Sequence, residues 1–83
     1  MYLAIVDVEP LQDYQLLLTF ENGEKRIFDM KPYLNKGIFK ELKDENVFRS
    51  VRVSFDSIEW SNQADIAPEV LYKWGQATDL STY

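Results

Sequence analysis

The fold is decided by a β-hairpin pattern in the first half of the chain, where residues 14–30 read YQLLLTFENGEKRIFDM. Two β-rich runs, residues 14–20 and 25–30, flank the dipeptide Asn22-Gly23. Asn-Gly between two such runs is a strong hairpin signal, because both central residues of a type I′ turn need positive φ, which Asn and Gly tolerate best. The pattern therefore predicts a two-residue turn between two antiparallel strands.

A two-residue turn also sets which residues face each other across the hairpin. Leu18 would lie opposite Ile27 on one face of the sheet. Leu17 would lie opposite Phe28 on the other face, which Met30 extends. Both faces would then be partly apolar, so either a second chain covers one of them or the sheet is wrapped within the domain.

A second hairpin is predicted in the second half of the chain. Residues 51–55 alternate between apolar and polar side chains, and the chain would turn after them and return. In this hairpin Phe55 would pair with Ile58 on the core face. Val53 would pair with Trp60 on the same face.

The other predicted elements are helical. Asp29 as a cap and Pro32 in the first turn indicate one helical turn at residues 29–34. An apolar stripe indicates a second short helix at 38–44. A final helix is predicted over residues 66–74, and Gly75 would stop it. Its inner face would carry Val70, Leu71 and Trp74.

These elements together predict an α+β fold in a single domain, residues 1–75. The expected architecture is a small antiparallel sheet built from two hairpins plus an N-terminal strand that ends at Pro10. Short helices would lie between the hairpins, and one C-terminal helix would follow the second. Residues 76–83 are predicted to form a polar C-terminal tail.

Composition excludes several classes of chemistry. The 83-residue chain has no cysteine and no histidine, which excludes disulfide frameworks, thiol nucleophiles, Ser-His or Cys-His catalysis and zinc sites built from Cys or His. No apolar run approaches the roughly 18 residues that span a bilayer, and the first residues lack the pattern of a secretory signal. We therefore expect a cytoplasmic protein with no membrane segment.

Carboxylates are the remaining candidates for catalysis. The candidates for a general acid–base pair are Asp29, Asp56, Glu59 and Asp65, and a hydrolase would bring Asp29, Glu59 and Asp65 into one concave site. However, Asp29 and Asp65 stand where helix caps are expected, and there is no histidine to relay protons near neutral pH. Neither a calcium-loop pattern nor a Gly-rich phosphate loop occurs. We expect no catalytic residue, no cofactor and no metal site, and keep the carboxylate hydrolase as an alternative.

Charge is distributed unevenly along the chain, whose formal net charge is −5. Residues 1–24 carry five acids and no base, residues 25–52 carry eight bases and four acids, and residues 53–83 carry five acids and one base. The basic middle segment could dock an acidic partner or nucleic acid, or simply keep exposed faces solvated. A nucleic-acid-associated regulator that uses residues 25–52 is therefore an alternative, although the overall negative charge disfavours nucleic acid as a partner.

Taken in order, the pieces of this sequence resemble a bacterial family known as domain of unknown function 2442. The resemblance spans residues 3–74, and its main runs are YQLLLTFENGE (14–24), FDMKPYL (28–34), IEW (58–60) and DIAPEVLY (65–72). It implies a small α+β domain without known catalytic residues, and a companion role beside another small protein, as in a toxin–antitoxin-like pair. Some members continue into a helix-turn-helix domain. We expect none after residue 74 here, and hence no direct transcriptional role.

The predicted function is that of a non-enzymatic interaction domain, which binds a small partner protein or a second copy of itself. Half-exposed aromatic side chains behave as interface anchors, which favours Tyr72 and Tyr33 as the docking centre. The full set of predicted docking residues is Leu17, Phe28, Tyr33, Lys36, Lys40 and Tyr72.

Overall fold

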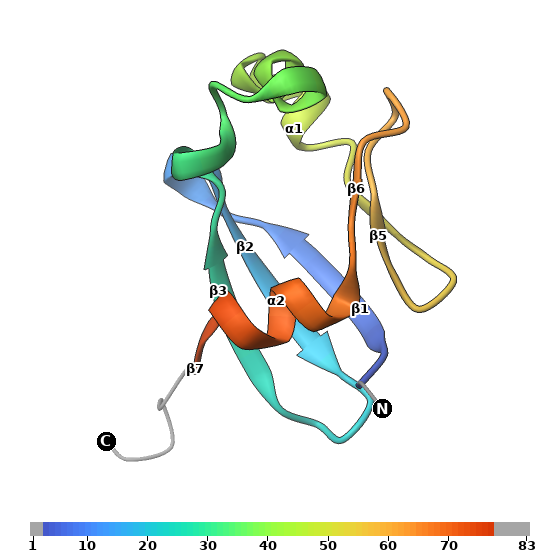
Figure 1. Ribbon diagram of the computed structural model, residues 1–83. Helices are drawn as coiled ribbons and strands as arrows, with labels where there is room; N and C mark the ends of the chain where they lie inside the picture. Colours follow the sequence, from blue (N-terminus) through green and yellow to red (C-terminus); the bar gives the residue numbers. More distant parts are fainter. Residues whose placement is uncertain (1–2, 78–83) are drawn as a thin grey trace.

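The structure, a computed structural model, describes residues 3–77 of the chain (Figure 1). Its strands form two antiparallel sheets. The first sheet has the order β1 (Ile5–Pro10), β2 (Gln15–Phe20), β3 (Lys25–Asp29) and β7 (Gln76–Ala77). The second has the order β4 (Arg52–Ser54), β5 (Ser57–Glu59) and β6 (Asp65–Ile66). The predicted α+β class is confirmed, and the two hairpins lie in separate sheets rather than in one.

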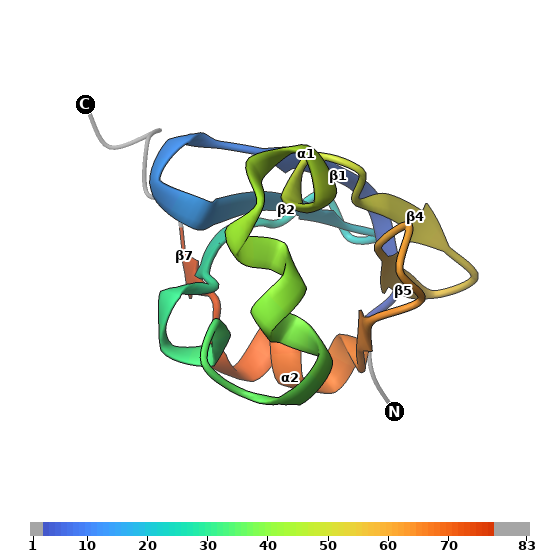
Figure 2. The ribbon, with the colours of Figure 1, turned by 90° about the horizontal axis from the view of Figure 1, so that it is seen from above.

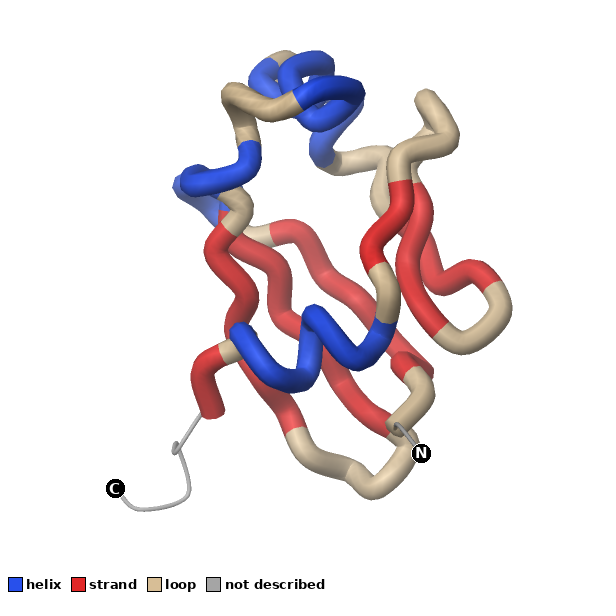
Figure 3. The backbone as a smooth tube through the Cα atoms, in the orientation of Figure 1, coloured by secondary structure: helices blue, strands red, loops and turns tan. Residues whose placement is uncertain are grey.

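Helical segments cover one face and one end of the first sheet (Figures 1 and 3). The helix α2 (Pro68–Trp74) lies across that face. A cap at one end consists of the 3₁₀ helix η3 (Gly37–Lys43) and the short helix α1 (Glu45–Phe48). Two single 3₁₀ turns, η1 (Gln12–Tyr14) and η2 (Lys31–Tyr33), precede β2 and follow β3. Seen from above, α2 lies on one side of β1 and β2, and no described helix lies on the opposite side (Figure 2). We call this opposite side the outer face of the first sheet.

The core lies between the first sheet, α2, the cap and the second sheet. Strand alternation turns every second residue of β2 inward, and the buried ones are Leu16, Leu18 and Phe20. Trp60 is fully buried, as predicted, and its indole Nε1–H donates to the Phe48 carbonyl at 3.0 Å. The other buried apolar residues are Ile5, Phe28, Met30, Leu34, Leu42, Phe48, Ile58, Ala64 and Leu71.

The register of the β2–β3 hairpin differs from the prediction by one residue. Leu17 lies opposite Ile27, and Leu16 lies opposite Phe28. A shift of one residue exchanges the two faces of a strand. Phe28 therefore points into the core, and the prediction that it shares a face with Leu17 is wrong.

The cause of this shift is the length of the turn. The Gly23 amide donates to the Phe20 carbonyl at 2.8 Å, and the Phe20 amide donates to the Glu24 carbonyl at 2.8 Å. Gly23 takes a positive φ of 87°, whereas Asn22 does not take positive φ. This is a three-residue loop, in which a type I turn is followed by a left-handed glycine. The Asn-Gly pair marks the hairpin correctly, but it does not form the expected two-residue turn.

The second hairpin also turns one residue earlier than predicted. Val53 lies opposite Ile58, and Phe55 and Asp56 form the turn. The Asp56 carbonyl accepts a hydrogen bond at 2.9 Å from the first amide of β1, which fixes the turn against the first sheet. The predicted pairs of Phe55 with Ile58 and of Val53 with Trp60 are therefore wrong.

The C-terminal helix is shorter than predicted. It begins at Pro68, and Asp65 lies in β6, so the prediction that Asp65 caps the helix is wrong. The helix packs on the core through Leu71, which is fully buried. Trp74 is 61% exposed, because it belongs to the last turn, beside the edge of the sheet where β7 begins. Its predicted place in the core is wrong.

The chain leaves α2 through a close approach at Gly75. A Cβ atom here would stand 2.6 Å from the Leu71 carbonyl oxygen and 3.1 Å from the Arg26 Cβ, so only glycine fits without a shift. The next two residues pair with β3 as the strand β7, so the first sheet continues into the segment predicted to be a polar tail. The rest of that predicted tail, residues 78–83, lies outside the described residues.

Candidate functional site

The residues predicted to dock a partner lie in different environments. Phe28 is 1% exposed, so it presents no surface to a partner. Leu17 is half-buried on the outer face of the first sheet, beside its cross-strand neighbour Ile27. Because Phe28 and Met30 are both buried, this outer face is less apolar than predicted.

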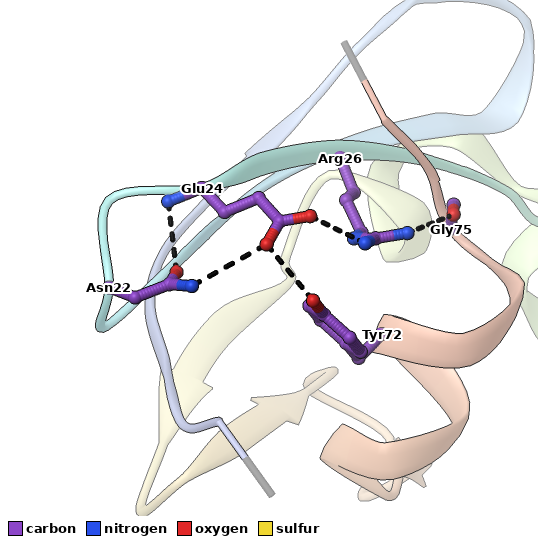
Figure 4. Close-up of polar contacts among 5 residues, drawn as sticks. All are labelled: Asn22, Glu24, Arg26, Tyr72 and Gly75. Atoms are coloured by element: carbon purple, nitrogen blue, oxygen red, sulfur yellow. Dashed lines mark hydrogen bonds and ion pairs between the residues drawn. The ribbon is translucent and has the colours of Figure 1, made fainter.

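Tyr72 of α2 is held against the β2–β3 hairpin (Figure 4). Its hydroxyl donates to Glu24 Oε1 at 3.0 Å, and its ring meets the Phe20 ring edge-on with centroids 5.2 Å apart. The Arg26 guanidinium lies 4.0 Å from the centre of the Tyr72 ring and forms an ion pair with Glu24 at 2.5 Å. Arg26 also donates to the Gly75 carbonyl at 3.0 Å. Tyr72 therefore joins α2 to the first sheet, and we call this group of contacts the Tyr72 clasp.

Glu24 is the acidic member of the clasp. Burial acts to raise its pKa, but hydrogen bonds from Tyr72, Asn22 and Arg26 outweigh burial and hold the pKa below its ordinary value. The carboxylate is therefore ionised at neutral pH, where it receives the tyrosine hydroxyl and the guanidinium together. The clasp has the character of a structural tie rather than of a reactive site.

Tyr33, the other half of the predicted docking centre, belongs to η2. Its ring stacks on Phe28 with centroids 5.6 Å apart, and the Lys36 Nζ lies 5.7 Å from its ring centre. Within residues 3–77, no hydrogen bond or ring contact joins Tyr33 to Tyr72. The structure does not bring the two tyrosines into one centre.

Several bases of the basic middle segment already form ion pairs. The Lys31 Nζ lies 2.9 Å from Asp13 and 3.3 Å from Asp29, and the hydrogen bond that it donates to Asp13 is the main cause of the raised pKa of Lys31. Arg52 pairs with Glu59 at 3.1 Å. The cap and its borders carry the exposed bases Lys36, Lys40, Lys43 and Arg49. A nucleic-acid role for the segment stays a prediction.

The three carboxylates of the hydrolase alternative do not meet in one place. Glu59 and Asp65 are cross-strand neighbours in β5 and β6. Asp29 lies in the first sheet, where its Oδ1 accepts the Lys31 amide at 2.9 Å. Among residues 3–77 there is no group of three or more acidic, histidine or cysteine side chains that could hold a metal ion. No helix in this part of the chain is long and apolar enough to cross a membrane.

Phe55, at the tip of the β4–β5 hairpin, is the most exposed large apolar residue among those described. Its side chain is 98% exposed, and its φ of 55° lies in the left-handed region that bulky residues rarely adopt. Val53 in β4 is also exposed, and Val6 in β1 is 55% exposed. Since β1 packs against β4 and β5, these three residues belong to adjoining elements. We call Val6, Val53 and Phe55, with the hollow described next, the hairpin surface.

A hollow of about 450 Å³ opens beside Phe55, between the β4–β5 turn, β6 and the start of α2. Its lining includes the half-buried apolar residues Ile66 and Pro68. Glu59 and Asp65 are also among the residues that line it. Residues 53–69 carry four acids and no base, so this part of the hairpin surface combines apolar groups with negative charge.

Sequence reasoning missed the hairpin surface because it placed Phe55 in the core. The residue types in the turn are the signal that could have revealed it. The run SFDS has neither glycine nor asparagine, the residues that accept positive φ most easily. A tight turn at this point therefore forces a bulky residue into the left-handed region, and a residue at the tip of a turn is exposed.

Comparison with known proteins gives one match. A model of the family described as "Protein of unknown function (DUF2442)" matches residues 5–77, the whole length from the start of β1 to the end of β7. No curated protein and no solved structure matches the chain.

Proposed function

The chain belongs to the DUF2442 family of proteins of unknown function, and from this premise, which brings no activity with it, we propose that the chain is a non-enzymatic protein-interaction domain. It docks its partner through the hairpin surface, with Phe55 as the anchor. The observation that carries this proposal is the 98% exposure of the Phe55 side chain at the tip of a tight turn.

Phe55 contributes little to the folding stability of its own chain. Burying a phenylalanine side chain contributes about 1.5–3 kcal/mol, and almost none of this is gained by a side chain that is 98% exposed. The left-handed backbone at Phe55 costs about 1–2 kcal/mol more. On docking, the same ring would be buried, and aromatic anchors at the centre of an interface carry much of its binding free energy. Exposure and strain together favour a role in binding.

The partner that we propose is a small cytoplasmic protein made together with this chain, in an arrangement like a toxin–antitoxin pair. The support for this is the resemblance of the sequence to companions of another small protein. Val6 and Val53 would widen the contact around Phe55, since both are exposed on elements that adjoin the turn. Single exposed apolar residues are common, whereas contiguous apolar patches mark interaction surfaces, and we propose that these three residues belong to one such patch.

Site-specific photo-crosslinking tests the proposal directly. The full chain is produced in its own cells with p-benzoylphenylalanine in place of Phe55, and separately in place of Trp74. Trp74 is the matched control, because it is also an exposed aromatic residue but lies at the end of α2. We expect a covalent adduct of defined mass from position 55 and none from position 74.

The crosslinked protein is then identified by mass spectrometry, purified and bound to the unmodified chain. We expect Phe55→Ala to weaken this binding at least about tenfold, the usual effect of removing an aromatic anchor. Adducts from neither position, or an affinity that Phe55→Ala leaves unchanged, would contradict the proposal.

A further inference from the structure

We propose that the partner docked at Phe55 is a basic protein segment, which places a lysine or arginine side chain in the hollow beside Phe55. This inference rests on the proposed function, and it adds the chemistry by which the partner is recognised. It is drawn from the shape of the hollow, from its lining and from the charges around it.

The hollow suits a long cationic side chain better than a compact one. Its volume of about 450 Å³ is ample for a lysine or arginine, and the half-buried residues Ile66 and Pro68 give its lining an apolar part. Lysine and arginine bury their methylene stems along apolar surface while the charged head stays beside polar groups. Glu59 and Asp65 supply such groups within the same lining.

The two carboxylates of the hollow give an independent reason to expect a cation. Glu59 and Asp65 lie directly opposite each other on β5 and β6, and like charges at such positions destabilise a sheet. Arg52 pairs with Glu59 at 3.1 Å from the β4 side, whereas Asp65 is exposed and has no ion pair within residues 3–77. A cationic group in the hollow would relieve the repulsion that Arg52 relieves only in part.

The charge around the hollow also favours a basic protein over the other possible occupants. Residues 53–69 carry four acids and no base, so a second copy docked through the same surface would bring these acids against one another. Nucleic acid would meet the same repulsion from its phosphates. A partner with lysine or arginine around an apolar pocket complements both Phe55 and the carboxylates.

A peptide titration tests this inference. The ¹⁵N-labelled full chain is titrated with two probes of equal length, acetyl-(Leu-Lys)₃-amide and acetyl-(Leu-Glu)₃-amide, and amide shifts are followed by NMR. We expect only the lysine peptide to shift the amides of residues 54–59 and 65–67. Its affinity should fall severalfold when NaCl is raised from 50 to 200 mM.

Two matched variants remove one carboxylate each. Asp65→Asn should weaken binding of the lysine peptide about two- to fivefold, because it removes a charge that lines the hollow. Glu9→Gln is the control, because Glu9 lies opposite Leu17 on the outer face of the first sheet. This variant should leave the affinity unchanged.

Several outcomes would overturn the inference while the proposed function stands. One is an equal response to the two peptides, and another is an equal loss of affinity in Asp65→Asn and Glu9→Gln. A third is a crosslinked partner at Phe55 that is a second copy of this chain. Conversely, if the lysine peptide binds in the hollow but Phe55 forms no crosslink, the proposed function fails and only the cation site remains.

Discussion

Replacing Phe55 with glycine is expected to stabilise the isolated chain. The φ of 55° at Phe55 costs a bulky residue about 1–2 kcal/mol, whereas glycine adopts it almost freely. Loss of the ring costs little, because the side chain is 98% exposed. Glycine also has more conformational freedom in the unfolded chain, which lowers the free energy of unfolding by about 0.5–1 kcal/mol. With the middle of each range, about 1.5 less about 0.75 kcal/mol, the net gain in the free energy of unfolding is about 0.75 kcal/mol.

Thermal unfolding followed by circular dichroism measures this gain. In a domain of this size 1 kcal/mol moves Tm by about 4–8 °C, so Phe55→Gly should raise Tm by about 2–8 °C. Phe55→Ala is the matched variant, because alanine removes the ring but keeps the backbone strain, and its Tm should stay within about 2 °C of the parent. A lower Tm for Phe55→Gly, or a clear loss in Phe55→Ala, would show that the ring stabilises the fold and would refute the reasoning.

Three further predictions concern the stability of the fold. Gly75→Ala should lower the free energy of unfolding in urea by about 1–3 kcal/mol, because the new Cβ would stand 2.6 Å from the Leu71 carbonyl oxygen; an unchanged midpoint would contradict this close approach. Phe28→Ala should cost about 3–5 kcal/mol in the same assay and Leu17→Ala only about 1 kcal/mol, since Phe28 is buried and Leu17 is on the outer face; similar costs would contradict the register. The pKa of Glu24 is lowered in the folded chain, so the stabilisation by the Glu24 carboxylate is present above the unfolded-state pKa near 4.3 and is lost as the pH falls through the folded-state pKa. Glu24→Gln removes this carboxylate and should flatten the decline in the free energy of unfolding between about pH 5 and pH 3. A parallel decline in both proteins would contradict this prediction.

The first hairpin shows what local sequence can and cannot settle. The run Glu21 to Glu24 predicts a turn between two strands, and the structure has that turn. Its length could not be predicted from the Asn-Gly pair, because Gly23 at positive φ serves a three-residue loop as well as a two-residue one. The choice is made by packing, which buries Phe28 rather than Ile27.

The two tryptophans show the same limit for helices and strands. Trp60 was predicted to be buried, and it is, although its predicted strand partner was wrong. Trp74 has the helical spacing of a core residue. That spacing shows which face of α2 points toward the core, but it does not show how far along the helix the core extends. The exposed hairpin surface was missed for a related reason, because Phe55 fits an alternating strand pattern until the turn position is known.

The strand β7 has a consequence for how the protein is made. β7 lies at the C-terminal end of the described chain and pairs with β3. The nearby hydrogen bond from Arg26 to the Gly75 carbonyl joins residues that are 49 positions apart in the sequence. On the ribosome, β1, β2 and β3 emerge first, and the part of this sheet's apolar side that α2 covers stays bare until α2 has been synthesised. The nascent chain therefore passes through an aggregation-prone stage, and folding can finish only after residue 77 has left the exit tunnel.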